Sequence, residues 1–329
     1  ILSMLKITGQ MVILVSFLLF QLGCDSDGDS TSGTQAVEPS NSQAEYCSRM
    51  QLSFEEFSGE PGGYLFGDLA EDFSVNKVGD TNWTFSENWT GCDSYIFFSY
   101  FDFLSESGKS YMEGLWSFSF SDIILASAKN AHYFFISGEV SEEARKSRME
   151  ALQSKLEQEL GSLFAEKPDE RAYWKERFHF VVDNLTNVSG SVGAFVNDYL
   201  AYKENATPVD LGDRGDAPAP YPFSFGIGRD QRWDSTGSLS EYVQGPENLK
   251  MIAFNTSFYN HRAELRARLA AETNTLVLPL IDESVTSRVF FKEVEFPEAG
   301  KMGEYDTFEI DVGVTCPHRN PFGCSEWDR

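Results

Sequence analysis

Three runs of apolar and aromatic residues, each about the length of one buried strand, set the strongest constraint on how this chain can fold. They are SYIFFSYF at 94–101, AHYFFIS at 131–137 and RFHFVVDN at 177–184. Two segments whose apolar residues recur at helical spacing lie between them, at 111–128 and 141–163. Strands that alternate with helices along a chain are typical of α/β structure, so we expect a sheet covered by helices here.

The second helical segment carries the clearest signal. Ser141 is placed as an N-cap, and Glu142 and Glu143 follow in the first turn, where the positive end of the helix dipole favours carboxylates. Apolar residues then recur at the spacing of one helix face, which we expect to pack against the core: Met149, Leu152, Leu156, Leu160 and Leu163.

Further segments extend the α/β region on both sides. PYPFSFGIGRDQRW at 220–233 predicts a hairpin that turns at residues 228–230. NHRAELRARLAAET at 260–273 predicts a final helix, with Asn260 as its cap. Residues 44–92 contain short aromatic segments separated by Gly and Asn, which indicate irregular β structure rather than helix.

This β-α-β-α-β-β order, with Pro220 and Pro222 leading into the hairpin, resembles the thioredoxin-like fold. In that family the redox cysteines follow the first strand, but DFLSESGKSYMEGLW at 102–116 contains no cysteine. The resemblance therefore implies that residues 46–280 form a thioredoxin-like accessory domain without dithiol chemistry, which binds or assembles instead.

Residues 275–329 change from helical spacing to alternation. FFKEVEF at 290–296 and TFEIDVGV at 307–314 each place apolar residues on one face, as strands of an antiparallel β-sandwich do. Two strands do not make a stable sheet alone. We expect an α+β protein in which residues 281–329 form only the first strands of a sandwich of the jelly-roll type, truncated here.

The last residues of the chain hold the most specific motif. A predicted strand leads into two cysteines and a run of charged and aromatic side chains: Cys316, Cys324, Glu326, Trp327, Asp328 and Arg329. This arrangement resembles the bacterial peptide:N-glycosidase F family, the amidases that remove N-linked glycans from asparagine. The resemblance covers residues 286–329 and implies a disulfide-closed loop ahead of the CSEWDR sequence.

The chemistry of that family suits these residues. Hydrolysis of a glycosylated amide needs a base that activates water and donors that stabilise the tetrahedral intermediate. The resemblance implies that Asp328 is the catalytic carboxylate, that Arg329 binds substrate and modulates the ionisation of Asp328, and that Trp327 and Glu326 shape the substrate pocket. It implies no cofactor, no metal, and N-glycosylated proteins or glycopeptides as partners. The family's other catalytic carboxylates come later in the chain, so we expect the 329 residues alone to be inactive.

The start of the chain predicts export. After Lys6, MVILVSFLLFQLGC at 11–24 is too short for a comfortable membrane span but suits a signal-peptide core. It ends at Gly23 and Cys24, which resembles a bacterial lipoprotein signal and implies that residues 1–24 hold a signal with Cys24 as the lipidation site, anchored to the cell envelope. A conventional cleaved signal and an uncleaved anchor are the alternatives. The Ser- and Gly-rich residues 25–45 are expected to be a disordered linker.

Export places the cysteines in an oxidising compartment. If Cys24 is acylated four cysteines remain, and by sequence distance the simplest pairs are Cys47 with Cys92 and Cys316 with Cys324; three connectivities are open. The absence of a CxxC motif and the scatter of the four histidines argue against a zinc site or a His-based triad: His132, His179, His261 and His318.

Charge and ligand types limit the other functions. A formal net charge of −25 and a pI near 4.4 argue against nucleic-acid binding, which needs clustered Lys and Arg. One alternative to the amidase is a non-enzymatic surface lipoprotein whose redox-inactive thioredoxin-like domain binds a partner. A second is a copper-dependent oxidase built on the same sandwich, against which the lack of clustered His or Met weighs.

Overall fold

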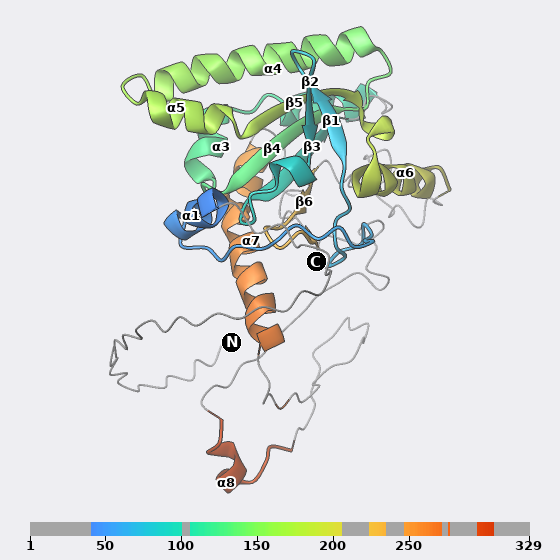
Figure 1. The fold of residues 1–329 in the computed structure, drawn as a ribbon. Coiled ribbons are helices and arrows are strands. Elements are labelled where there is room, and N and C mark those ends of the chain that lie inside the picture. Colours follow the sequence, from blue (N-terminus) through green and yellow to red (C-terminus); the bar gives the residue numbers. More distant parts are fainter. Residues whose placement is uncertain are drawn as a thin grey trace, which may run out of the picture. The chain divides into compact units, whose positions relative to one another are not determined.

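The computed structural model of the protein is a mixed α+β fold. Its described residues form eight α-helices and one mixed sheet of seven strands in the order β2-β1-β5-β4-β3-β6-β7 (Figure 1). The expected α+β class is therefore confirmed at this level. The structure describes the following residues: 41–100, 106–205, 224–234, 247–271, 276 and 295–305.

Three neighbouring parallel strands form the centre of the sheet. They are β3 (Ser94–Tyr100), β4 (Ala131–Ser137) and β5 (Phe178–Asn184). Every residue of β3 and β4 is buried, because these strands are covered on both faces, as their continuous apolar sequences require. The three predicted strands are confirmed to within one residue at each end.

A hairpin extends the sheet at each side. The first pairs β1 (Ser74–Lys77) with β2 (Thr81–Thr84), and the last residue of β1 lies opposite Val181 of β5. The second pairs β6 (Ser224–Ile227) with β7 (Trp233–Asp234), and β6 runs antiparallel to β3. The second hairpin confirms the one predicted from the sequence.

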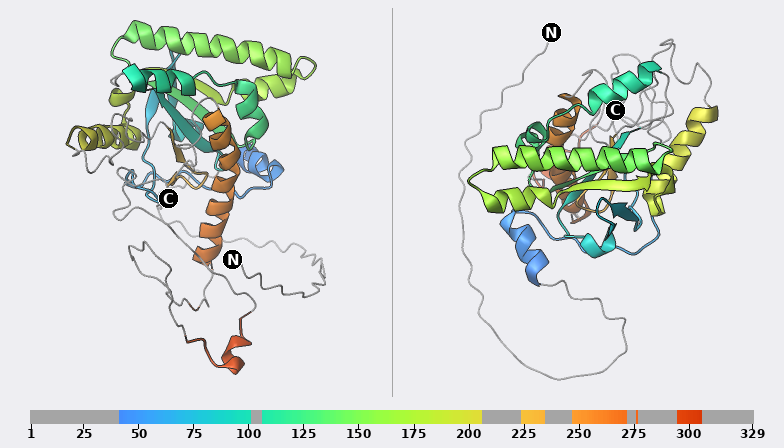
Figure 2. Two further views of the ribbon diagram at one scale, coloured as in Figure 1. Left: turned by 180° about the vertical axis from the view of Figure 1, so that it is seen from behind. Right: turned by 90° about the horizontal axis from the view of Figure 1, so that it is seen from above.

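Helices cover the face of the sheet that carries Phe135 and Phe178 (Figures 1 and 2). Aromatic rings on these helices meet the strands: Phe120 contacts both of these residues, and Trp174 contacts Phe178. Tyr259 approaches Gly226 of β6 on this face. The helices are α2 (Glu106–Leu115), α3 (Phe120–Ala126), α4 (Glu142–Leu163), α5 (Pro168–Lys175) and α7 (Glu247–Ala271).

The opposite face of the sheet is packed mainly by aromatic side chains that come from residues 73–89. Phe134 on this face contacts Phe73, Phe97 and Trp83. Helix α6 (Gly190–Asn205) covers the part of this face near the second hairpin. Two short 3₁₀ helices, η1 (Ser86–Asn88) and η2 (Leu185–Asn187), lie in the connections.

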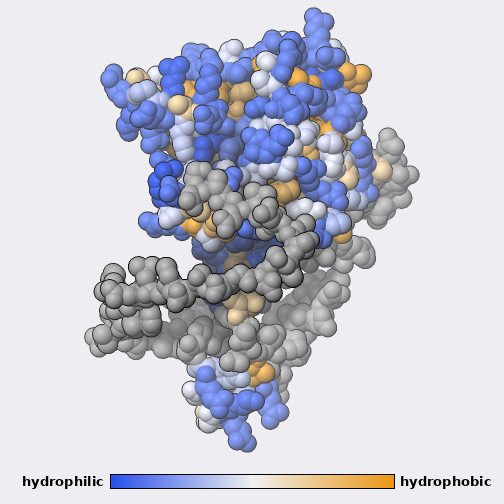
Figure 3. Space-filling model, viewed as in Figure 1, coloured by the Kyte–Doolittle hydropathy of each residue, from blue (hydrophilic) through white to orange (hydrophobic). Residues whose placement is uncertain are grey.

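Helix α4 forms as its sequence predicts. Ser141 caps its start, and the Ser141 hydroxyl accepts a hydrogen bond from the backbone N–H of Ala144 at 3.2 Å. Four of the five residues predicted to face the core are buried and Leu163 packs against the core while partly exposed. The molecular surface around α4 is mostly hydrophilic, as a one-sided core-facing helix requires (Figure 3).

The prediction of a single helix over 111–128 was wrong. Two helices, α2 and α3, occupy this region, and residues 116–119 break them apart. Ser119 is extended, with φ −101° and ψ 133°. Trp116, Phe118 and Phe120 are all buried, a spacing that a continuous helix cannot place on one face, so core packing favours the break.

Three other local predictions differ from the structure. Asn260 does not cap a helix, because α7 already begins at Glu247 and Asn260 instead exchanges side-chain hydrogen bonds with Asn130. Helix α1 (Asn41–Arg49) forms where irregular structure was expected, and its first residues overlap the predicted linker. Helix α6 was not predicted. Residues 50–92 otherwise have the irregular, β-containing character that we expected.

The predicted strands of the sandwich lie almost wholly outside the described residues. Residues 295–305 are described, and within them α8 (Ala299–Met302) falls where a loop between the two strands was expected. Among the helices that the structure describes, none combines the length and the apolar character needed to cross a membrane.

Candidate functional site

The residues singled out by the amidase resemblance lie outside the described part of the chain. So do Cys24 and His318. The roles of these residues therefore stay predictions: Cys316, Cys324, Glu326, Trp327, Asp328 and Arg329. A different group of polar side chains, in the α/β region, comes together around the disulfide that the structure contains.

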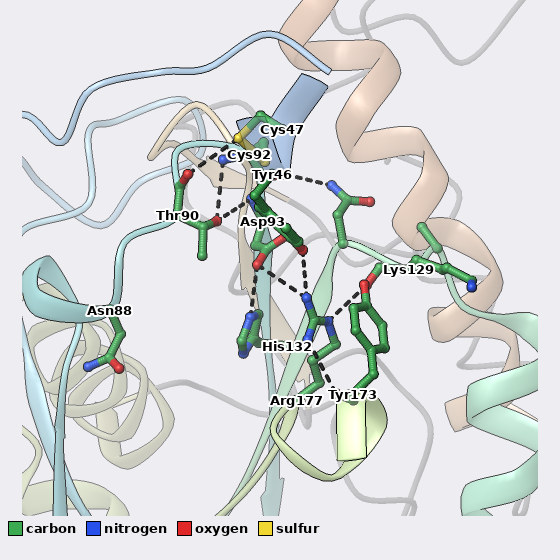
Figure 4. A network of polar contacts seen from close by, with 12 residues as sticks. Tyr46, Cys47, Asn88, Thr90, Cys92, Asp93, Lys129, His132, Tyr173 and Arg177 are labelled. Atoms are coloured by element: carbon green, nitrogen blue, oxygen red, sulfur yellow. Dashed lines mark hydrogen bonds and ion pairs between the residues drawn. A yellow bond between two sulfur atoms is a disulfide. The ribbon is translucent and has the colours of Figure 1, made fainter. Parts of the chain in front are cut away.

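The disulfide joins Cys47 of α1 to Cys92, which lies two residues before the start of β3. Both cysteines are fully buried. Of the three open connectivities, the structure thus confirms the pair Cys47–Cys92. The residues that follow and precede the two cysteines, Asp93 and Tyr46, are brought face to face by this link (Figure 4).

Asp93 is a fully buried carboxylate at the amino end of β3. Its Oδ1 accepts a hydrogen bond of 2.8 Å from the Tyr46 hydroxyl, and its Oδ2 lies 3.0 Å from Nε2 of His132. The Arg177 guanidinium lies 3.9 Å from the same Oδ2. A buried charge is tolerated only when such partners replace its lost hydration, and Asp93 has partners on both oxygens.

Arg177 is held in place on all three of its nitrogens. It donates to the carbonyl oxygens of Lys129 at 3.0 Å and Tyr173 at 3.2 Å, and to the Tyr46 hydroxyl at 2.6 Å. Its guanidinium also lies 3.6 Å from the centre of the Tyr173 ring, in cation–π geometry. Arg177 therefore serves as a fixed counter-charge to Asp93 rather than as a mobile surface cation (Figure 4).

Two histidines continue the network away from Asp93. His132 and His179 are the second residues of β4 and β5, and Nδ1 of His132 lies 2.9 Å from Nε2 of His179. If both rings are neutral, His132 donates through Nε2–H to Asp93 and accepts at Nδ1 from His179. Asp93, His132 and His179 then form one hydrogen-bonded relay.

The ionisation states follow from burial and neighbours. Burial alone would raise the pKa of Asp93, but its contact with His132, the charge of Arg177 and the hydrogen bond from Tyr46 hold it below its ordinary value. Burial lowers the pKa of His179 well below its ordinary value, and the nearby cations reinforce this. At neutral pH the relay therefore starts at an ionised Asp93 and ends at a neutral His179.

A pocket of about 560 Å³ opens onto this relay. Asp93, His132, His179 and Arg177 all line it, and so does Trp83, whose ring lies 5.5 Å from that of His179. Neutral polar side chains complete much of the wall: Gln43, Thr81, Asn88, Thr90 and Gln153. The pocket is thus polar, which suits a small hydrogen-bonding ligand.

Lys77 is the cation of the pocket wall that lacks a counter-charge. It ends β1, is only partly exposed, and forms no ion pair or side-chain hydrogen bond in the described part of the chain. Because Lys77 pairs with Val181, and His179 is two residues before Val181, the two side chains lie on the same face of the sheet. Burial lowers the pKa of Lys77.

Sequence reasoning missed this site because its residues are far apart in the chain. His132 and His179 were judged too scattered to act together, yet parallel strands bring them into contact. A signal was present: each histidine interrupts an otherwise apolar run at its second position. The described residues contain no group of three or more His, Cys, Asp or Glu side chains arranged to hold a metal ion.

No protein-family model, curated protein or solved structure matches this chain. The functional assignment therefore depends on the sequence motif and on the geometry of the pocket.

Proposed function

We propose that this protein is an exported amidase of the peptide:N-glycosidase type, which hydrolyses the side-chain amide bond of a glycosylated asparagine and so releases the N-linked glycan. The observation that carries the proposal is the combination of Cys316, Cys324 and the sequence CSEWDR after a strand-like segment. Asp328 is the proposed base that activates water, and Arg329 the residue that binds substrate and tunes Asp328. Trp327 and Glu326 shape the pocket.

In this proposal the α/β region is an accessory domain of the thioredoxin-like type. The element order supports that finer class: β3, α2 and α3, β4, α4 and α5, β5, then the hairpin β6–β7 and the helix α7, with α6 added before the hairpin. The segment after β3 has no cysteine, so its expected role is binding. Residues 281–329 are then the opening of the catalytic sandwich of the jelly-roll type.

The pocket at the amino ends of β4 and β5 supports a substrate-holding role for this accessory domain. Its wall contains neutral hydrogen-bonding side chains, which suit the hydroxyl groups of a sugar. The fixed relay behind the wall keeps the polar groups in one geometry before ligand arrives, which reduces the entropic cost of binding.

The disulfide supports the proposed export. Disulfides persist in oxidising compartments and are rare in the cytosol, and Cys47–Cys92 is fully buried in the core. We propose that Cys24 carries the lipid anchor of a bacterial cell-envelope protein, or that a conventional signal is removed and the protein is secreted.

The test uses the full-length gene product and a denatured N-glycosylated protein. The amidase releases the intact glycan and converts the acceptor asparagine to aspartate, which mass spectrometry of the peptide reads directly. Glycan release that leaves asparagine unchanged, or no release at all, contradicts the proposal.

A second candidate is a non-enzymatic surface lipoprotein in which the α/β region binds a partner. The observation that favours it is the braced polar pocket in a domain without dithiol chemistry. The same experiment separates the two candidates, because only the amidase changes the acceptor asparagine.

A further inference from the structure

From the pocket we infer a binding site for an acidic sugar, in which the ammonium group of Lys77 contacts the carboxylate or phosphate of the ligand and His179 contacts a hydroxyl group. The choice of a sugar rests on the proposed function. The negative charge of the ligand rests on the pocket alone.

In the described part of the chain, no charged residue that lines the pocket forms an ion pair with Lys77. Arg177 is matched by Asp93, and Lys175 pairs with Glu157 at 2.6 Å outside the wall. Glu176 also lines the pocket, but it is exposed and forms no ion pair with Lys77. Lys77 has given up part of its hydration and, in the described part of the chain, has gained no ion pair in return.

An anion in the pocket would compensate Lys77. A partly buried ammonium group binds a carboxylate or phosphate through charge-assisted hydrogen bonds, which are shorter and stronger than neutral ones. The lowered pKa of Lys77 has the same cause, since burial without a counter-charge disfavours the ammonium form. A neutral ligand would leave this imbalance in place.

His179 can supply a hydrogen-bond acceptor in addition to the positive charge of Lys77. If both rings are neutral, Nε2–H of His179 donates to Nδ1 of His132, and Nε2–H of His132 donates to the ionised Asp93. In that neutral arrangement Nδ1 of His179 is an acceptor. Within the described residues His179 makes no further side-chain hydrogen bond. The relay therefore leaves an acceptor that suits a donor such as a sugar hydroxyl.

The size of the pocket argues for more than a bare ion. A volume of about 560 Å³ is in the range of small-molecule sites and is far larger than acetate or inorganic phosphate requires. Thr81, Asn88 and Gln153 line it with hydroxyl and amide groups. A single anionic group on a polyhydroxylated ring satisfies both the unmatched cation and this neutral wall.

The experiment is isothermal titration calorimetry on the full chain with glucuronate, glucose 6-phosphate, glucose, acetate and inorganic phosphate. At least one of the two acidic sugars should bind, and the comparison of glucuronate with glucose 6-phosphate tells which acid group the site prefers. Glucose and the two small ions should each bind at least about tenfold more weakly, a difference of about 1.4 kcal/mol.

Two variants test the contact itself. Lys77→Met should weaken binding of the acidic sugar by about tenfold or more, while Lys77→Arg, which keeps the charge, should retain most of the affinity. Lys146→Met is the matched control, because Lys146 is an exposed lysine of α4 that does not line the pocket. It should change the affinity by less than about threefold.

Four results would overturn the inference, the first three of which concern relative affinities. These three are an unchanged affinity in Lys77→Met, glucose binding as tightly as the acidic sugars, and acetate or phosphate binding as tightly as the acidic sugars. Failure of both acidic sugars to bind would overturn it as well. Binding is measured without turnover, so it can succeed where glycan release fails, and the two proposals can therefore fail separately.

Discussion

His132 and His179 meet across two neighbouring parallel strands, with Nδ1 of the first 2.9 Å from Nε2 of the second. Their rings are nearly parallel, at an angle of 8°. Because His179 is buried and lies beside cations, it stays neutral, and the pair connects the ionised Asp93 to the pocket wall. This contact makes the stability of the α/β region depend on pH.

The first prediction concerns acidification. Folded His179 has a pKa well below the ordinary value of 6.5. The unfolded chain therefore binds an additional proton as the pH falls below that value, so the stabilising contribution is present above pH 6.5 and is lost below it. Between pH 7 and pH 5.5 this group alone should cost about 1 kcal/mol of unfolding free energy.

The comparison uses His179→Gln, which keeps an N–H donor near His132 but does not titrate in this range. Urea unfolding at the two pH values should show a smaller loss of stability for this variant than for the wild type. His261→Gln, at an exposed position of α7, is the control and should keep the wild-type pH dependence. Equal pH dependence in wild type and His179→Gln would show that His179 is not the responsible group.

The second prediction concerns Asp93. Asp93→Ala leaves the guanidinium of Arg177 buried without its counter-charge, so it should lower the unfolding free energy by about 3–5 kcal/mol. Asp169→Asn, at an exposed position of α5, should cost less than about 1 kcal/mol. Chemical denaturation measures both. A loss for Asp93→Ala no larger than that of the control would mean that the relay is not structurally coupled to Arg177.

The central strands could be predicted from the sequence because they are buried on both faces, so their apolar character does not depend on register. Helix α4 could also be predicted, because its cap and its apolar stripe are local signals. The helix over 111–128 was wrong for a different reason. Whether Trp116 and Phe118 belong to a helix depends on how they pack against Phe135, a residue of β4. The periodicity of the local sequence carries no information about that distant residue.

The third prediction concerns the disulfide. Cys47 and Cys92 are 45 residues apart, and loop-closure entropy assigns about 4 kcal/mol to a link of that length. The double variant Cys47→Ala/Cys92→Ala should therefore unfold at a clearly lower urea concentration. Dithiothreitol should lower the midpoint of the wild type toward that of the variant and affect the variant much less, because the variant lacks this disulfide and keeps only the predicted Cys316–Cys324 pair. A reductant effect of equal size in both proteins would exclude this disulfide as the cause.

The fourth prediction concerns the contact of α7 with the sheet. A Cβ added at Gly226 would collide with the hydroxyl of Tyr259, so Gly226→Ala should destabilise the fold by about 1–3 kcal/mol. Gly161→Ala, in the last turn of α4 with open space around it, should instead stabilise by up to about 0.5–1 kcal/mol. Thermal unfolding compares the two. Equal effects would mean that α7 does not pack on β6 as described.

The candidate site was harder to predict than the fold. Nothing in the sequence says that residues 132 and 179 occupy equivalent positions on adjacent strands; that follows from the parallel register. The pairing of Cys47 with Cys92 was one of three open connectivities, and the nearness of Asp93 to Tyr46 depends on it. Local motifs such as CSEWDR can be recognised in a sequence, whereas a relay assembled by topology cannot.

The most direct test of the proposed function is glycan release by the full-length protein carrying Asp328→Asn, beside Glu304→Gln as a control at an exposed carboxylate outside the motif. We expect Asp328→Asn to lose at least about 100-fold in the rate of glycan release, as removal of a general base does, while Glu304→Gln keeps the wild-type rate. Release by Asp328→Asn at the wild-type rate would contradict the assignment of Asp328 as the base.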